Sequence, residues 1–172
     1  MIETRYITDV TPALSEFIGE CNSRGFKNNN NLKAMKFYNT LNEGGHWFAT
    51  FNNSKIVGVS GMHHFKDGWR ALFRGAQLHS MPGGLSKNHM NCWMFYYHLP
   101  LVIDLASSNP IYITTNTNTD ESGSMLRLNK LYSILEKKRI VEFISTEQIF
   151  YVEQNVWKLN HERYFELRPE VK

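Results

Sequence analysis

The feature that most restricts the fold is a stretch of alternating hydrophobic and polar residues from His46 to His79. Two turn signals divide it, the polar run Asn52–Lys55 and the dipeptide Asp67-Gly68, which is typical of a tight hairpin. Alternation with a period of two predicts strands that bury one face. We therefore predict three consecutive antiparallel strands joined by short turns, over residues 46–51, 56–65 and 69–79.

Helical patterns lie on both sides of these strands. Thr11 and Pro12 are typical of a helix start. The residues that follow them place a hydrophobic stripe on one helix face, namely Leu14, Phe17, Ile18 and Cys21. We predict further helices through Leu32 to Tyr38, from His89 onward with a bend or break near Pro100, and over residues 124–139. Short β-rich runs predict strands within 1–10 and at 111–115, 141–143, 148–152, 156–159 and 164–167.

This order of elements predicts the fold class. An antiparallel meander gives way to a β–helix–β unit, so the sheet should be mixed. We predict an α/β (α+β) protein with a mixed, mostly antiparallel twisted sheet and helices on both faces. Among the 172 residues no linker composition appears, which predicts one domain over residues 1–172.

The composition limits which cellular location and which partners are expected. A hydrophobic content of 42% is ordinary for a globular protein, and a net charge of +3 gives no indication of nucleic acid. Cys21 and Cys92 form no CxxC pair, and the N-terminus has no signal-peptide pattern. The most apolar stretch, residues 92–106, is too short and too polar to span a bilayer. A cytoplasmic location without a membrane partner is expected.

Three segments carry a resemblance to a known family: Trp47–Val59, the loop with Gly83-Gly84 ahead of a helix, and Leu128–Lys138. With the element order, they resemble the GNAT superfamily of acyl-CoA-dependent N-acetyltransferases. The resemblance implies transfer of an acetyl group from acetyl-CoA, as cosubstrate, to a small-molecule or peptide amine. We expect a monomer or a homodimer. The alternative is a non-catalytic domain of the same fold that binds a protein or a nucleic acid.

In the family, a glycine loop that opens a helix binds the pyrophosphate of CoA, because backbone N–H groups there are free to bind anions. The family's loop usually has Arg or Gln where this chain has Ser80 and Met81. CoA is then held by a modified loop, or the fold has lost it, or the loop is an ordinary strand-to-helix turn. The resemblance implies these cofactor-binding residues: Leu78, Gly83, Gly84, Leu85, Ser86, Lys87 and Asn116.

Two residues are candidates for catalysis. Tyr132 matches the family's helix after the fifth strand, where a tyrosine commonly protonates the leaving thiolate. A phenol with a pKa of about 10 is protonated at neutral pH and can donate. His79 ends the third predicted strand and has a suitable pKa to accept the substrate proton. The alternatives are a core aromatic beside Leu128 and Leu135, and a surface histidine.

No metal site is expected, because His63 and His64 are adjacent on a predicted strand and point to opposite faces. Trp69, Arg70, Phe73 and Arg74 interleave aromatic and basic residues, as a nucleic-acid surface does. Alternation places the two arginines on the face opposite the aromatic rings, as in an ordinary half-buried strand. Nucleic acid is therefore not an expected partner.

Overall fold

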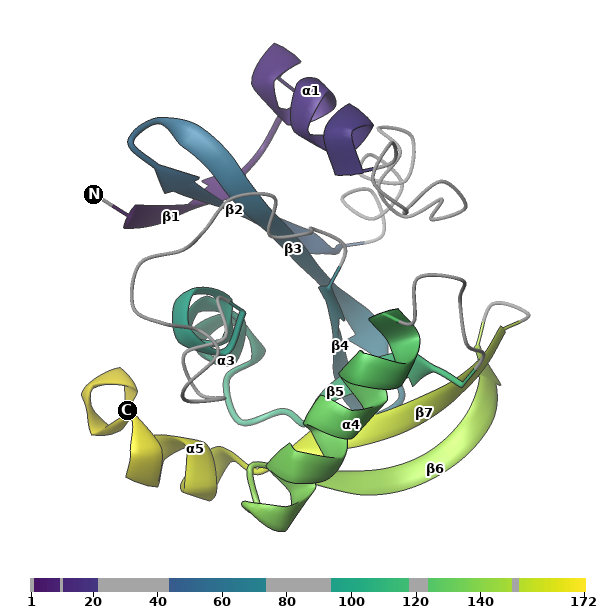
Figure 1. The fold of residues 1–172 in the computed structure, drawn as a ribbon. Coiled ribbons are helices and arrows are strands. Elements are labelled where there is room, and N and C mark those ends of the chain that lie inside the picture. The colour runs from purple at the N-terminus through teal and green to yellow at the C-terminus, as the bar shows by residue number, and fades with distance from the viewer. Residues whose placement is uncertain (1, 10, 22–43, 74–93, 118–123, 150–151) are drawn as a thin grey trace. The chain divides into compact units, whose positions relative to one another are not determined.

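The computed structural model describes residues 2–9, 11–21, 44–73, 94–117, 124–149 and 152–172 (Figure 1). The predicted helix through Leu32 to Tyr38 lies outside these residues. The elements are β1 (Ile2–Ile7), α1 (Pro12–Cys21), β2 (His46–Asn52), β3 (Lys55–Phe65), β4 (Gly68–Phe73), the π-helical η4 (Met94–His98), α3 (Leu99–Ala106), β5 (Ile111–Asn116), α4 (Ser124–Lys137), β6 (Val141–Ile149), β7 (Val152–Leu159), α5 (His161–Leu167) and the 3-10 helix η5 (Pro169–Val171).

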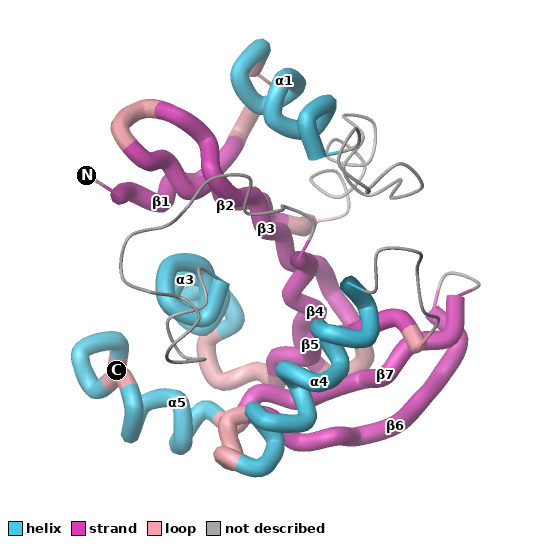
Figure 2. The backbone as a smooth tube through the Cα atoms, viewed as in Figure 1, coloured by secondary structure: helices cyan, strands magenta, loops and turns pink. Residues whose placement is uncertain are grey.

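The seven strands form one sheet in the order β1-β2-β3-β4-β5-β7-β6. The connection from β4 to its neighbour β5 contains η4 and α3, and such a crossover joins parallel strands. The amide of Trp69 donates to the carbonyl of Pro110 at 2.9 Å, so the two strands start side by side. The predicted α/β class with a mixed, mostly antiparallel sheet is confirmed (Figure 2). The chain divides into two compact units, residues 1–64 with 71–105 and residues 65–70 with 106–172.

The first unit contains the antiparallel strands β1, β2 and β3. Thr50 lies opposite Thr4 of β1, and Ala49 lies opposite Val59 of β3. Asn53 and Ser54 connect β2 to β3 with φ angles of 49° and 71°. Two central residues with positive φ define the turn whose twist suits a hairpin. The predicted strands at 46–51 and 56–65 are confirmed, and no helix interrupts β3.

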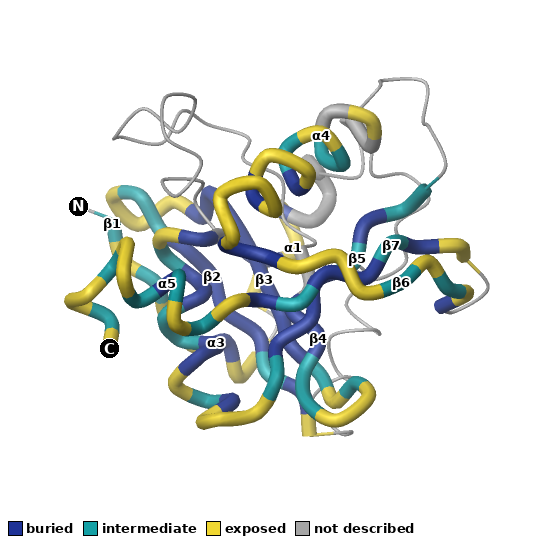
Figure 3. The backbone as a smooth tube through the Cα atoms, turned by 90° about the horizontal axis from the view of Figure 1, so that it is seen from below, coloured by how far each residue is buried: buried dark blue, intermediate teal, exposed yellow. Residues whose placement is uncertain are grey.

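Side chains alternate between the two faces of this unit. On one face Trp47 covers Gly61, where an added Cβ would lie 2.9 Å from the indole ring. On the other face the ring of Phe48 meets the imidazole of His98 from η4, with ring centroids 6.3 Å apart. Both β2 and β3 are therefore largely buried, as Figure 3 shows in dark blue.

The two helices of this unit follow the predicted patterns where they are described. The hydroxyl oxygen of Thr11 caps α1 by accepting from the amide of Leu14 at 3.2 Å, and Leu14 and Phe17 are buried. The second helix changes from π to α geometry at Leu99, one residue before Pro100. Proline has no amide hydrogen to donate, so a change of helix type is expected there.

The second unit contains β5, β7 and β6, with α4 against β5 and β6 (Figure 1). Helix α4 buries Tyr132 and Leu135 and exposes Ser133 and Glu136. It ends where the amide of Ile140 donates to the carbonyl of Leu135 at 2.9 Å. The predicted helix at 124–139 is thus confirmed, two residues shorter at its C-terminal end.

Two of the predicted strands in the C-terminal part are wrong. Residues 164–167 belong to α5, because the side chain of Asn160 accepts from the amide of Arg163 at 3.1 Å and caps a helix. Residues 148–152 span the end of β6 and the beginning of β7. The β-rich residues there continue across the connection without a glycine or proline to mark it.

Gly68 supplies the first prediction. An added Cβ at Gly68 would lie 2.0 Å from the carbonyl oxygen of Pro110, which is backbone and cannot move aside alone. We expect Gly68→Ala to lower the free energy of unfolding by about 2 kcal/mol, because β4 must move away from the start of β5. Denaturant unfolding measures this free energy. Gly44→Ala is the comparison, because an added Cβ at Gly44 would strain a backbone with a φ of 83° and would not press on a neighbouring carbonyl. Unchanged stability of Gly68→Ala would contradict the close approach.

Candidate functional site

Two of the predicted site residues lie within the described part of the chain. Tyr132 is on α4 and Asn116 is the last residue of β5. The remaining ones lie outside the described residues and stay predictions: Leu78, His79, Gly83, Gly84, Leu85, Ser86 and Lys87. Within the described residues, the candidate site consists of the end of β5 and of α4, the helix that follows it.

Asn116 is half-buried and lies opposite Gln154 of β7. Its carbonyl oxygen accepts a hydrogen bond of 2.9 Å from the side-chain amide of Asn129 on α4. The backbone of β5 is thus tied to α4 at the strand end where the resemblance implies a CoA contact. Its role in binding CoA stays a prediction.

A buried hydrogen-bond chain lies one residue earlier on β5. The indole N–H of Trp157 donates to the hydroxyl of Thr115 at 3.0 Å, and this hydroxyl donates to Oδ1 of Asn129 at 2.6 Å. An indole can only donate, so the hydroxyl hydrogen of Thr115 is free to point at Asn129. Asn155 of β7 also donates to Oδ1 of Asn129, at 3.1 Å.

Asn129 was not found by the sequence reasoning. Its signal is weak, because asparagine is a poor helix former, and here it stands in the middle of a helical pattern. Its partners are 13, 14 and 26 residues away, so no local spacing reveals them. Only the packing of α4 on β5 and β7 brings these groups together.

Tyr132 is one helical turn after Asn129 and is 1% exposed. Its ring lies against the indole of Trp157, with centroids 5.5 Å apart and an interplanar angle of 35°. This packing is what a core aromatic has, and it also fixes the direction of the ring. The role of Tyr132 as an acid therefore stays a prediction.

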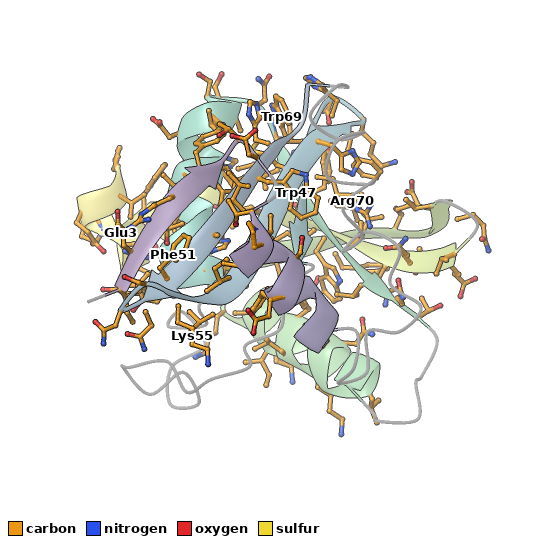
Figure 4. All side chains as sticks on the ribbon, turned by 90° about the horizontal axis from the view of Figure 1, so that it is seen from above. Glu3, Trp47, Phe51, Lys55, Trp69 and Arg70 are labelled. Atoms are coloured by element: carbon orange, nitrogen blue, oxygen red, sulfur yellow. The ribbon has the colours of Figure 1, made fainter. Side chains whose placement is uncertain are left out.

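Arg70 is a buried residue of β4. Figure 4 labels Trp69 and Arg70 on β4, and Arg70 is the more buried of the two, at 1% exposed. Its guanidinium donates to the hydroxyl of Thr114 at 2.8 Å and to the side-chain oxygen of Gln154 at 3.1 Å. A guanidinium engaged inside the protein is not available to a nucleic-acid phosphate.

Among the described residues of the first unit, His98 and His46 are two histidines with lowered pKa values. Burial lowers the pKa of His98 to about 3, so its imidazole is neutral at physiological pH. The pKa of His46 is lowered mainly by burial and to a smaller extent by the charge of the nearby His64. Its Nδ1 lies 2.7 Å from the hydroxyl of Tyr6. Within the described residues no three His, Cys, Asp or Glu side chains are grouped as metal ligands.

A pocket of about 470 Å³ lies in the second unit. Charged side chains of both signs line it, including Arg139, Lys158 and Glu162. Its walls contain neither Asn116 nor Tyr132.

None of the helices in the described residues is long and apolar enough to cross a membrane.

Solved structures of acetyltransferases are similar to this chain over nearly its whole length. An N-acetyltransferase from Staphylococcus aureus Mu50 is 9% identical, with a TM-score of 0.63 over 93% of this chain and 97% of that one. Campylobacter jejuni N-acetyltransferase PseH in complex with acetyl coenzyme A is 13% identical, with a TM-score of 0.54 over 94% and 99%. A protein ascribed to the GNAT family from Desulfovibrio desulfuricans is 10% identical, with a TM-score of 0.62 over 93% and 99%.

The chain has the fold of the GNAT N-acetyltransferases, as the sequence resemblance implied. No protein-family model and no curated protein sequence matches the chain. At identities near 10% the likeness shows the fold, and one fold can host several activities.

Proposed function

We propose that this protein transfers an acetyl group from acetyl-CoA to the nitrogen of a small-molecule or peptide amine. The observation that carries the proposal is the agreement with N-acetyltransferase structures over 93% of the chain, because a shared fold of full length also shares the order of the strands around the site. One of these structures is described as a complex with acetyl coenzyme A. Catalysis by this chain, at one site in a single domain of residues 1–172, is the proposal.

The chemistry needs a base for the amine, an acid for the leaving thiolate and a fixed geometry. In this proposal His79 accepts the proton that the amine loses, directly or through water, as the C–N bond forms. Tyr132 holds at Oη the proton that the thiolate sulfur takes up as the C–S bond breaks. Leu78, Gly83 to Lys87 and Asn116 hold the cosubstrate, chiefly through backbone N–H groups at its phosphates.

Calorimetric titration with acetyl-CoA tests the proposal. We expect measurable affinity in the wild type and at least a tenfold loss, about 1.4 kcal/mol, in Gly84→Val, because a branched side chain blocks close backbone approach. Thiol release with a panel of small amines and amino-terminal peptides then identifies the acceptor class. Unchanged affinity in a folded Gly84→Val protein would place the cosubstrate elsewhere.

The absence of affinity for acetyl-CoA in the wild type would overturn the proposal. It would favour a non-catalytic domain of the same fold, which the replacement of the usual Arg or Gln by Ser80 and Met81 also favours. A cytoplasmic location and a monomeric or homodimeric state belong to the same proposal. Sedimentation of the purified protein distinguishes the two states.

A further inference from the structure

We propose that Asn129 is a positioning residue for acyl transfer, and that it acts through Thr115 and Trp157 on Tyr132. This inference rests on the proposed function, since the group it positions is the proposed acid. The starting point is that α4 carries Asn129 and Tyr132 one turn apart, so both project from the same side of the helix.

The first step is the orientation of the Asn129 amide. The carbonyl of Asn116 can only accept, so the side-chain atom 2.9 Å from it is the donor Nδ2. Oδ1 then accepts from Thr115 at 2.6 Å and from Asn155 at 3.1 Å. One side chain thus joins α4 to the end of β5 and to β7, and its amide has one allowed orientation.

The second step is the fixed indole. Trp157 is 5% exposed, and its N–H has Thr115 as acceptor at 3.0 Å. The hydroxyl of Thr115 is itself oriented by Asn129. The face of Trp157 meets the ring of Tyr132, so the chain Asn129–Thr115–Trp157 determines where that ring lies.

If these hydrogen bonds hold Tyr132 in place, their loss should lower the rate of acyl transfer. A displacement of about 1 Å at a reacting group lowers a rate by about a hundredfold. Loss of the Thr115 hydroxyl should therefore lower kcat while KM for acetyl-CoA stays nearly constant, because Thr115→Val leaves in place the hydrogen bond from Asn129 to the carbonyl of Asn116, a proposed cosubstrate-binding residue. If these hydrogen bonds only stabilised the fold, their loss would lower the melting temperature and would not lower kcat at constant KM.

The test compares four variants with the wild type by melting temperature, kcat and KM for acetyl-CoA. We expect Asn129→Ala and Thr115→Val to lower kcat by at least about tenfold. KM should stay within about twofold in Thr115→Val, which keeps the Asn129 contact to Asn116. Thr115→Ser keeps the hydroxyl and should restore most of kcat. Ser133→Ala is the matched control, since its exposed hydroxyl donates only to the backbone carbonyl of Asn129 in α4, at 3.0 Å, and we expect its kcat to be unchanged.

The outcomes separate the two proposals. A wild type that does not turn over acetyl-CoA overturns the proposed function, and this inference with it. A wild type that turns over, with full kcat in both Asn129→Ala and Thr115→Val, overturns this inference alone, as does a raised KM at unchanged kcat. If Asn129→Ala does not fold, the Thr115→Val and Thr115→Ser pair decides, because valine and threonine have nearly the same shape.

Discussion

Tyr132→Phe is expected to lower turnover by about 10²- to 10⁴-fold, the usual contribution of a positioned proton donor. The variant removes one oxygen and keeps the ring that packs on Trp157. Affinity for acetyl-CoA and the melting temperature should therefore change little. Steady-state rates, calorimetry and a melting curve on the same preparation measure all three quantities.

Tyr112 offers a matched control for this prediction. It is a second buried tyrosine of the same unit, and its hydroxyl donates to the carboxylate of Asp67 at 2.6 Å. Burial, with the Asp67 contact as a further cause, raises the pKa of Tyr112 to about 12, so the hydroxyl stays protonated. Tyr112→Phe should change stability and leave turnover within about twofold. A full-rate Tyr132→Phe enzyme would instead assign Tyr132 to the core.

The second large effect concerns His98 and pH. Its imidazole is 0% exposed, hydrogen-bonds to the hydroxyl of Thr50 and packs on the ring of Phe48. Burial lowers its pKa in the folded protein to about 3, whereas the unfolded chain has the ordinary value of about 6.5. Below pH 6.5 the unfolded chain takes up a proton that the folded protein refuses. Stability is therefore complete above pH 6.5 and falls as the pH decreases toward 3.

Below pH 6.5 the expected slope is about 1.4 kcal/mol per pH unit, which amounts to a loss of about 2 kcal/mol between pH 7 and pH 5 and about 4 kcal/mol by pH 3. Denaturant unfolding at pH 5, 6 and 7 measures it. His98→Gln keeps a hydrogen-bonding side chain that cannot titrate, so the wild type should lose about 2 kcal/mol more than this variant. Burial also lowers the pKa values of His46 and His161. Both histidines are present in the wild type and in His98→Gln, so their effect on stability cancels in the difference between the two proteins.

Equal slopes in the wild type and His98→Gln would contradict the neutral, buried imidazole. If His98→Gln does not fold, the imidazole signals of the wild type in an NMR titration decide instead. We expect the His98 ring to remain neutral at pH 5. Protonation near pH 6.5 would show that solvent reaches it.

The meander of β2, β3 and β4 is the part of the fold that local sequence patterns predict best. Residues 46–65 follow a period of two, and their hairpin is closed by Asn53 and Ser54 with positive φ angles, so the pattern and the turn agree. Gly68 is a different case. The dipeptide Asp67-Gly68 correctly predicts the turn, but the residue with positive φ is Lys66, and Gly68 is needed because of the carbonyl of Pro110.

The candidate site was less accessible to sequence reasoning. Tyr132 and Asn116 came from the resemblance, and nothing in their spacing indicated Asn129, which contacts Asn116 directly. The β-rich run at 164–167 was misassigned, because the capping contact of Asn160 outweighs the β propensity of residues that follow it.

The sequence by itself determined the order and kind of most elements, and with them the fold class, because periodicity and turn residues act over a few positions. The tertiary structure alone decided which polar side chains lie inside. Arg70 and His98 are buried and Asn129 is half-buried, and each has a partner more than ten positions away. A polar group is stable in the interior only where packing brings it a hydrogen-bond partner, so its burial is a property of the folded chain.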